Sequence, residues 1–161
     1  METEILELQM ASFRLGDKLF AIDIMRIREI VLPHRISALP RASKILDGMI
    51  NLRGVVIPVM NLRSRFDMPV LFSSAGKLMI VSIAGRPVAL AVDDVDEVLE
   101  VKVKNIVQAP DMIGEVWAEY LIGVCLDSDN LYMILNIDAL FTPAEHRELG
   151  RFAGEFQHAE A

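Results

Sequence analysis

The residue types that most often perform catalysis or bind metals are scattered through this chain of 161 residues. Its three histidines, His34, His146 and His158, are not spaced with cysteine or carboxylates as a metal-binding set would be. The single cysteine, Cys125, lies among apolar residues with no base nearby in the sequence, which favours a buried, inert thiol. Phosphate-binding glycine loops and the Gly-x-Ser-x-Gly elbow do not occur. These patterns predict a protein that is not an enzyme and uses no metal or cofactor.

One acidic run could in principle hold a divalent cation. It comprises Asp93, Asp94, Asp96, Glu97 and Glu100. The run lacks the alternating oxygen ligands and the glycine of a calcium-binding loop. We therefore interpret it as the solvated face of a strand.

A second chemically suggestive stretch runs from Gly48 to Arg63 and contains Asn51-Leu-Arg-Gly54. Asn51 and Gly54 tolerate positive φ, which predicts a tight turn between two strands, with Arg53 directed outward. Pro58 removes one ladder donor and predicts an edge, a bulge or a bend in the second strand. From these residues alone, a solvated arginine on an ordinary hairpin is the simpler interpretation.

The elements that must position these residues are mostly short strands. Alternating apolar residues and turn signals predict strands over residues 5–15, 19–24, 55–60, 78–84, 88–92, 95–101, 120–126 and 131–137. Residues 25–32 are ambiguous between helix and strand, and we expect a short turn followed by a strand that carries Glu29 outward. Single helical turns are expected over 43–47 and 61–66, and the strand over 95–101 should contain a bulge. The hairpin between 78–84 and 88–92 should turn at Gly85-Arg86. Such a pattern is typical of sandwiches and small barrels.

The C-terminal segment changes from strand to helix periodicity. Thr142-Pro143-Ala144-Glu145 combines an N-cap threonine, a proline at the first helical position and a glutamate at the third, which predicts a capping box. Leu149, Phe152, Ala153 and Phe156 follow at helical spacing and form one apolar face. This segment is the clearest helix in the sequence.

Charge and composition narrow the function classes. The net charge is −7, but residues 1–66 carry +3 and residues 67–161 carry −10, which suggests two surfaces for different partners. The acidic half discourages nucleic-acid binding. No apolar run reaches the roughly 18 residues needed to span a membrane, and the N-terminus is acidic where a signal peptide is basic. With one cysteine, these features predict a soluble cytoplasmic protein.

Taken together, a series of short motifs resembles the CheW family of chemotaxis coupling proteins. The most specific is Gly48-x2-Asn-Leu-Arg-Gly followed by Ile57-Pro-Val-x-Asn-Leu-Arg63. Weaker matches are Leu15-Gly-Asp, Phe20-Ala-Ile-Asp, Arg28-Glu-Ile, Ile36-x3-Pro40, Val88-x3-Val92-Asp93, Val95-x2-Val98, Tyr120-x2-Gly123 and Ile134-Leu-Asn-Ile-Asp138. The resemblance covers residues 8–142, which we take as one domain, and residues 143–161 form a C-terminal helix and tail.

The resemblance implies a mostly β fold of two intertwined five-stranded SH3-like barrels that share a core. It also implies a non-enzymatic adaptor that couples the cytoplasmic tips of methyl-accepting chemoreceptors to the regulatory domain of a chemotaxis histidine kinase. Family receptor-binding positions fall on Ile27, Glu29, Asn51, Arg53, Leu78 and Val98, and the family glutamate and arginine that tend to pair match Glu29 and Arg53. Asn61 stands where many relatives have aspartate, which puts one local charge contact in doubt. The alternative function is a small-molecule-sensing or self-assembling structural barrel.

Overall fold

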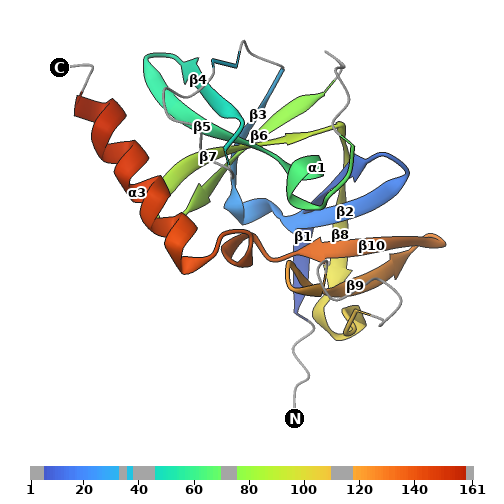
Figure 1. Cartoon of the computed structure of the whole chain (residues 1–161). Coiled ribbons are helices and arrows are strands. Elements are labelled where there is room, and N and C mark those ends of the chain that lie inside the picture. The colour runs from blue at the N-terminus through green and yellow to red at the C-terminus, as the bar shows by residue number, and fades with distance from the viewer. Residues whose placement is uncertain (1–5, 33–35, 38–45, 70–75, 110–117, 159–161) are drawn as a thin grey trace.

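A computed structural model describes residues 6–32, 36–37, 46–69, 76–109 and 118–158, with side chains up to residue 151. Its helices and strands form two five-stranded sheets and one long C-terminal helix (Figure 1). In chain order they are β1 (Glu7–Leu15), β2 (Lys18–Asp23), η1 (Ile24–Arg26), β3 (Ile27–Val31), β4 (Gly48–Leu52), β5 (Val55–Asn61), α1 (Leu62–Arg65), β6 (Lys77–Ile83), β7 (Arg86–Val92), β8 (Asp94–Lys102), η2 (Val103–Asn105), β9 (Leu121–Asp127), β10 (Asn130–Leu135), η4 (Ile137–Ala139) and α3 (Pro143–His158).

The two sheets have the same internal plan. The first has the strand order β8-β1-β2-β10-β9 and the second has the order β3-β6-β7-β5-β4. In each sheet two antiparallel hairpins are joined by one parallel pair, β2 with β10 in the first and β7 with β5 in the second. The second sheet is one continuous segment of chain inserted between β2 and β8 of the first. Each sheet curls into a small barrel, which confirms the predicted fold, and we call them the first and second barrels.

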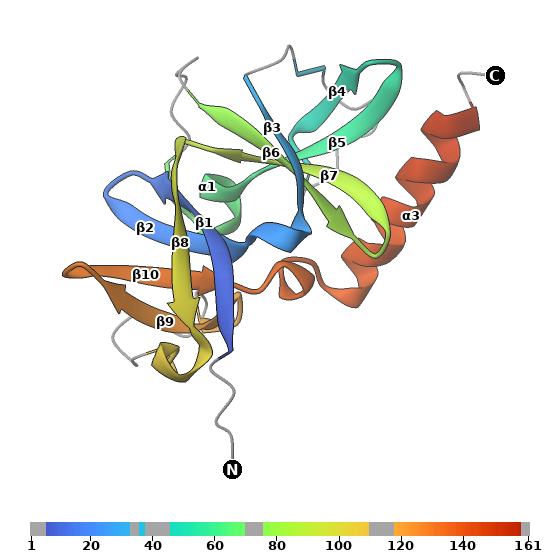
Figure 2. The ribbon, with the colours of Figure 1, turned by 180° about the vertical axis from the view of Figure 1, so that it is seen from behind.

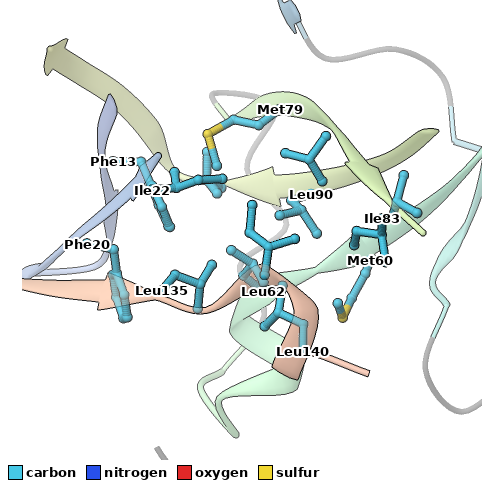
Figure 3. Packing of buried hydrophobic residues seen from close by; sticks show 14 of the residues in the cluster. Phe13, Phe20, Ile22, Met60, Leu62, Met79, Ile83, Leu90, Leu135 and Leu140 are labelled. Atoms are coloured by element: carbon cyan, nitrogen blue, oxygen red, sulfur yellow. The ribbon is translucent and has the colours of Figure 1, made fainter. Parts of the chain in front are cut away.

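The two barrels share one apolar core (Figure 3). Phe13 and Phe20 of the first barrel stack at 5.4 Å between ring centroids, and Phe20 also contacts Phe66, which follows α1. Met79 and Leu90 enter the same core from the second barrel and are fully buried. Branched aliphatic residues and methionines fill the rest, and each barrel has a smaller interior cluster of its own. The shared core makes the two barrels one rigid support for the surface.

Most of the predicted local structure is confirmed. The turn and outward strand expected over 25–32 are η1 and β3, and α1 is the expected helical turn before Phe66. The predicted bulge lies between β1 and β8, where the Ser12 hydroxyl donates to the carbonyl of Glu97 at 2.7 Å and accepts from its amide at 3.1 Å. The helical turn expected over 43–47 falls mostly outside the described residues, but Leu46 is buried as predicted.

Three local predictions need correction. The β6–β7 turn is Ala84-Gly85 and not Gly85-Arg86, because Ile83 pairs with Arg86 and both turn residues have positive φ. The strand expected to end at residue 137 ends at Leu135, where the chain turns into η4. β5 is an interior strand and not an edge; Pro58 is tolerated because the parallel ladder to β7 begins at Val59, after the missing N–H.

The C-terminal helix begins with the predicted capping box. The Thr142 hydroxyl accepts a hydrogen bond from the Glu145 amide at 3.2 Å, and the Glu145 carboxylate accepts one from the Thr142 amide at 2.8 Å. Glu145 also pairs with Arg65 of α1 at 3.0 Å, and Leu149 is buried in the shared core. Phe152, Ala153 and Phe156 lie outside the described side chains. These contacts dock α3 beside the second barrel (Figure 2).

Candidate interaction surface

The hairpin between β4 and β5 presents Arg53 at the surface. Leu52 pairs with Val55, so the turn consists of Arg53 and Gly54, with φ of 53° and 85°. Two successive positive φ angles define the type I′ turn that suits a two-residue hairpin. The side-chain oxygen of Asn51 accepts a hydrogen bond from the Gly54 amide at 2.9 Å and fixes this turn. The strained φ of Arg53 costs about 1–2 kcal/mol, which the turn contacts must offset.

Arg53 forms an ion pair with Glu29 of β3. β3 and β4 are the two outer strands of the second sheet, so the ion pair spans the seam where this sheet curls on itself. The Arg53 side chain is 68% exposed and that of Glu29 is 34% exposed. An ion pair so open to water contributes about 0–1 kcal/mol to stability. Its structural consequence is therefore orientation: it holds both side chains at the surface in a defined geometry.

The other four expected site residues do not all join this pair. Ile27 lies on β3, half-buried against the shared core, and Asn51 is exposed at the base of the Arg53 turn. Val98 is 53% exposed on β8, which is an outer strand of the first barrel. Leu78 is only 3% exposed; it pairs with Val31 of β3 and packs in the interior of the second barrel. Leu78 can therefore influence a surface contact only by supporting β3 from beneath.

Exposed apolar side chains lie close to Glu29 and Arg53 in the sequence, and the sequence analysis did not single them out. Ile30 and Leu32, on β3 and just after it, are 43% and 71% exposed, and Val55, after the Arg53 turn, is 46% exposed. Clustered exposed aliphatic residues are typical of protein-binding surfaces. Consecutive apolar residues in a strand that has only one neighbouring strand are the signal that could have revealed Ile30.

A second ion pair connects the two barrels. Arg63 of α1 binds both carboxylate oxygens of Asp93, with its Nε 2.7 Å from Oδ1, and donates to the carbonyl of Pro69 at 3.0 Å. Asp93 also accepts from the Gly16 amide, in the turn of the β1–β2 hairpin, at 2.7 Å. Hydrogen bonds from Arg63 lower the pKa of Asp93 below its ordinary value. This network joins the second barrel to the turn of the first.

Three acids of the acidic run form ion pairs with basic residues that are distant in the sequence. Besides Asp93, Asp94 pairs with Lys77 and Asp96 pairs with Arg14 at 2.7 Å. The expectation of a solvated strand face is confirmed for the acids of β8, since Asp94, Asp96, Glu97 and Glu100 are all exposed, and basic residues distant in sequence pair with two of them. Across the described residues, no group of His, Cys, Asp and Glu is arranged to hold a metal ion.

The remaining local features concern single groups. Cys125 is buried in the interior of the first barrel, and burial raises the pKa of its thiol, as suits the inert thiol predicted. Asn61 accepts a hydrogen bond from the Arg63 amide at 2.9 Å and so caps α1 without a charge. Within the described part of the chain, no helix is both long and apolar enough to span a bilayer.

Comparison with known proteins agrees with this architecture. The chain is 30% identical over 141 residues to the chemotaxis protein CheW of Rhizobium meliloti, covering 87% of this chain and 90% of that protein. It is 28% identical over 148 residues to the chemotaxis protein CheW of Treponema pallidum, covering 89% and 87%. The solved structure of the scaffolding protein TtCheW from Thermoanaerobacter tengcongensis superposes with a TM-score of 0.76 at 27% identity, covering 88% of this chain and 92% of that one. The family model described as a CheW-like domain matches residues 9–145, and the chain belongs to this family.

Proposed function

We propose that this protein is a non-enzymatic adaptor of chemotaxis signalling, which couples the cytoplasmic tip of a chemoreceptor to the regulatory domain of a chemotaxis histidine kinase in the cytoplasm. Relatives named chemotaxis protein CheW and a solved relative named a scaffolding protein support the adaptor role. The rigid double barrel is suited to holding two partners at a fixed separation.

The observation that carries the receptor half of this proposal is the exposed Glu29–Arg53 ion pair, with exposed Ile30 next to Glu29 in β3 and exposed Val55 two residues after Arg53. A receptor helix with an apolar stripe and flanking charges fits such a surface: the aliphatic side chains supply buried area, and the paired charges fix orientation. In this proposal Glu29, Arg53 and Val98 contact the receptor directly.

The three remaining family receptor-binding positions act differently. Ile27 is half-buried and anchors the start of β3 on the shared core, and Leu78 packs beneath the same strand in the interior of the second barrel. Asn51 fixes the Arg53 turn, because its side-chain oxygen accepts a hydrogen bond from the Gly54 amide. Substitutions at these positions act through the shape of the surface. Replacing Leu78 is therefore expected to reduce stability together with receptor affinity.

The test measures binding of a receptor-tip fragment and, separately, of a kinase regulatory domain. Arg53→Glu places two carboxylates at the seam and is expected to weaken receptor-tip binding by about tenfold or more, since hot-spot changes commonly cost more than 1 kcal/mol. Lys104→Ala, at an exposed site on the first barrel, is the control and should leave this affinity unchanged.

The swap Glu29→Arg combined with Arg53→Glu separates pairing from direct contact. If the two residues act as a pair, the double variant recovers part of the affinity that Arg53→Glu loses. Unchanged receptor-tip binding in Arg53→Glu would rule out the assignment of this surface. Absence of binding to either partner in the unmodified protein would rule out the adaptor function itself.

A further inference from the structure

Four arginines lie on the elements that come together where α3 packs beside the second barrel. They are Arg28 of β3, Arg86 at the start of β7, and Arg147 and Arg151 of α3, and all four are exposed. We call these four residues the basic patch. In a chain with a net charge of −7, such a gathering of like charge needs an explanation.

A series of contacts brings the patch together. Arg28 donates to the Ser82 hydroxyl at 3.2 Å and lies 3.4 Å from the carbonyl of Gly85, so it reaches the β6–β7 turn. Arg86 follows Gly85, and its guanidinium packs against Gly150 of α3. A Cβ added at Gly150 would lie 3.3 Å from the Arg86 Nη1 atom. Both ribbon views show the β6–β7 end beside α3 (Figures 1 and 2).

The helix contributes the other two charges. Arg147 precedes Gly150 by three residues and Arg151 follows Arg147 by four, so helical spacing sets both on neighbouring turns around the glycine that Arg86 contacts. Arg147 and Arg151 are four residues apart and repel each other, so their arrangement costs stability rather than adding to it. Glu148 lies three residues before Arg151 and therefore offsets part of its charge.

Two other acids near the patch bind arginines that do not belong to it. Asp138 binds Arg26 through both carboxylate oxygens, and Glu145 binds Arg65. None of the four patch arginines forms an ion pair with a carboxylate in the described part of the chain. The guanidinium groups are therefore available to an external anion, for which bidentate carboxylate binding is the favoured geometry.

We propose that the basic patch is a docking surface for an acidic segment of a partner protein, separate from the Glu29–Arg53 surface. The whole chain is acidic, with a net charge of −7, which disfavours an anionic membrane, because such membranes attract basic segments. Four cations are also too few for the wide basic surface that nucleic acids need. Arg147 and Arg151 lie beyond the matched family region, whereas Arg28 and Arg86 lie within it.

The test uses a fluorescein-labelled peptide of twelve glutamates as the acidic probe, with binding followed by fluorescence anisotropy. The triple variant R86A/R147A/R151A is expected to weaken binding by about tenfold, since exposed charge pairs each contribute modestly. The variant K18A/K102A/K104A removes the same charge from the first barrel and should change binding less than about twofold. Binding by the unmodified protein should weaken as salt rises from about 50 to 200 mM, because exposed charges are screened.

Further variants and probes keep the proposal open to refutation. R147A/R151A leaves the Arg86–Gly150 contact intact, so it separates lost charge from disturbed helix docking, and circular dichroism confirms folding; it should still weaken binding. Equal losses in the two triple variants, or no loss in either, would overturn the proposal. So would binding to phosphatidylserine vesicles without binding to the peptide. Self-association that the patch variant abolishes, without peptide binding, would assign the patch to a second copy of the chain and overturn it as well.

Discussion

Replacing Arg63 with methionine tests the ion pair that connects the two barrels. The Arg63 side chain is only 10% exposed and that of Asp93 is 32% exposed. Methionine keeps the apolar stem, but among the described residues it leaves the Asp93 carboxylate with the Gly16 backbone amide as its remaining hydrogen-bond donor, and it deprives the Pro69 carbonyl of its partner. Breaking a well-buried ion pair costs about 3–5 kcal/mol. Because Asp93 is a third exposed, we expect a loss of about 2–4 kcal/mol in the free energy of unfolding.

The assay is thermal and urea denaturation at neutral pH. For a chain of this size, each kcal/mol shifts the melting temperature by about 2–4 °C, so Arg63→Met should lower it by about 5–15 °C. Asp93→Asn and the double variant complete a cycle in which the two changes are not additive, with a coupling energy of about 1–2 kcal/mol. Lys77→Met removes the exposed partner of Asp94 and should leave the melting temperature nearly unchanged.

The pH dependence has a defined sign. Arg63 holds the pKa of Asp93 below its ordinary value, so the stabilisation is present above the unfolded-state pKa of about 4 and is lost as pH falls through the folded-state pKa. The stability difference between the unmodified protein and Arg63→Met should therefore narrow in acid. An equal difference at neutral and acidic pH, or additive single changes, would refute the view that this ion pair joins the barrels.

Two further predictions concern backbone packing and helix capping. Gly123→Ala should lower the free energy of unfolding by about 2–4 kcal/mol, because the added Cβ would lie 2.4 Å from the carbonyl oxygen of Val107. Gly48→Ala should have a similar effect, because Gly48 occupies the equivalent place in the second barrel and its Cβ would lie 2.3 Å from the carbonyl oxygen of Ser37. Urea midpoints equal to that of the unmodified protein in both variants would contradict this packing. Thr142→Ala should lower the free energy of unfolding by about 1 kcal/mol, because it removes the acceptor for the Glu145 amide, whereas Thr142→Ser should retain stability. Equal melting temperatures for the unmodified protein and both variants would show that the capping box contributes nothing.

Local chemistry made much of this fold predictable. Alternating apolar residues specify the strands, and Asn51-Leu-Arg-Gly54 specifies a tight turn, although the residue that has positive φ together with Gly54 is Arg53 and not Asn51. The capping box of Thr142 and Glu145 depends on residues three apart, so the start of α3 could be located from the sequence. The order of short motifs was enough to indicate the family, and with it the pairing of Glu29 with Arg53.

What the sequence could not provide are contacts between distant segments. Whether Leu78 faces the surface or the interior depends on which side of β6 the shared packing covers, and the structure buries it. The pairing of Arg63 with Asp93 crosses 30 residues, and the fit of Ser12 into the β8 bulge crosses 85. The gathering of Arg28 and Arg86 around α3 likewise depends on how the helix docks. Sequence patterns report interactions between near neighbours, whereas these contacts exist only after the two barrels close on their common core.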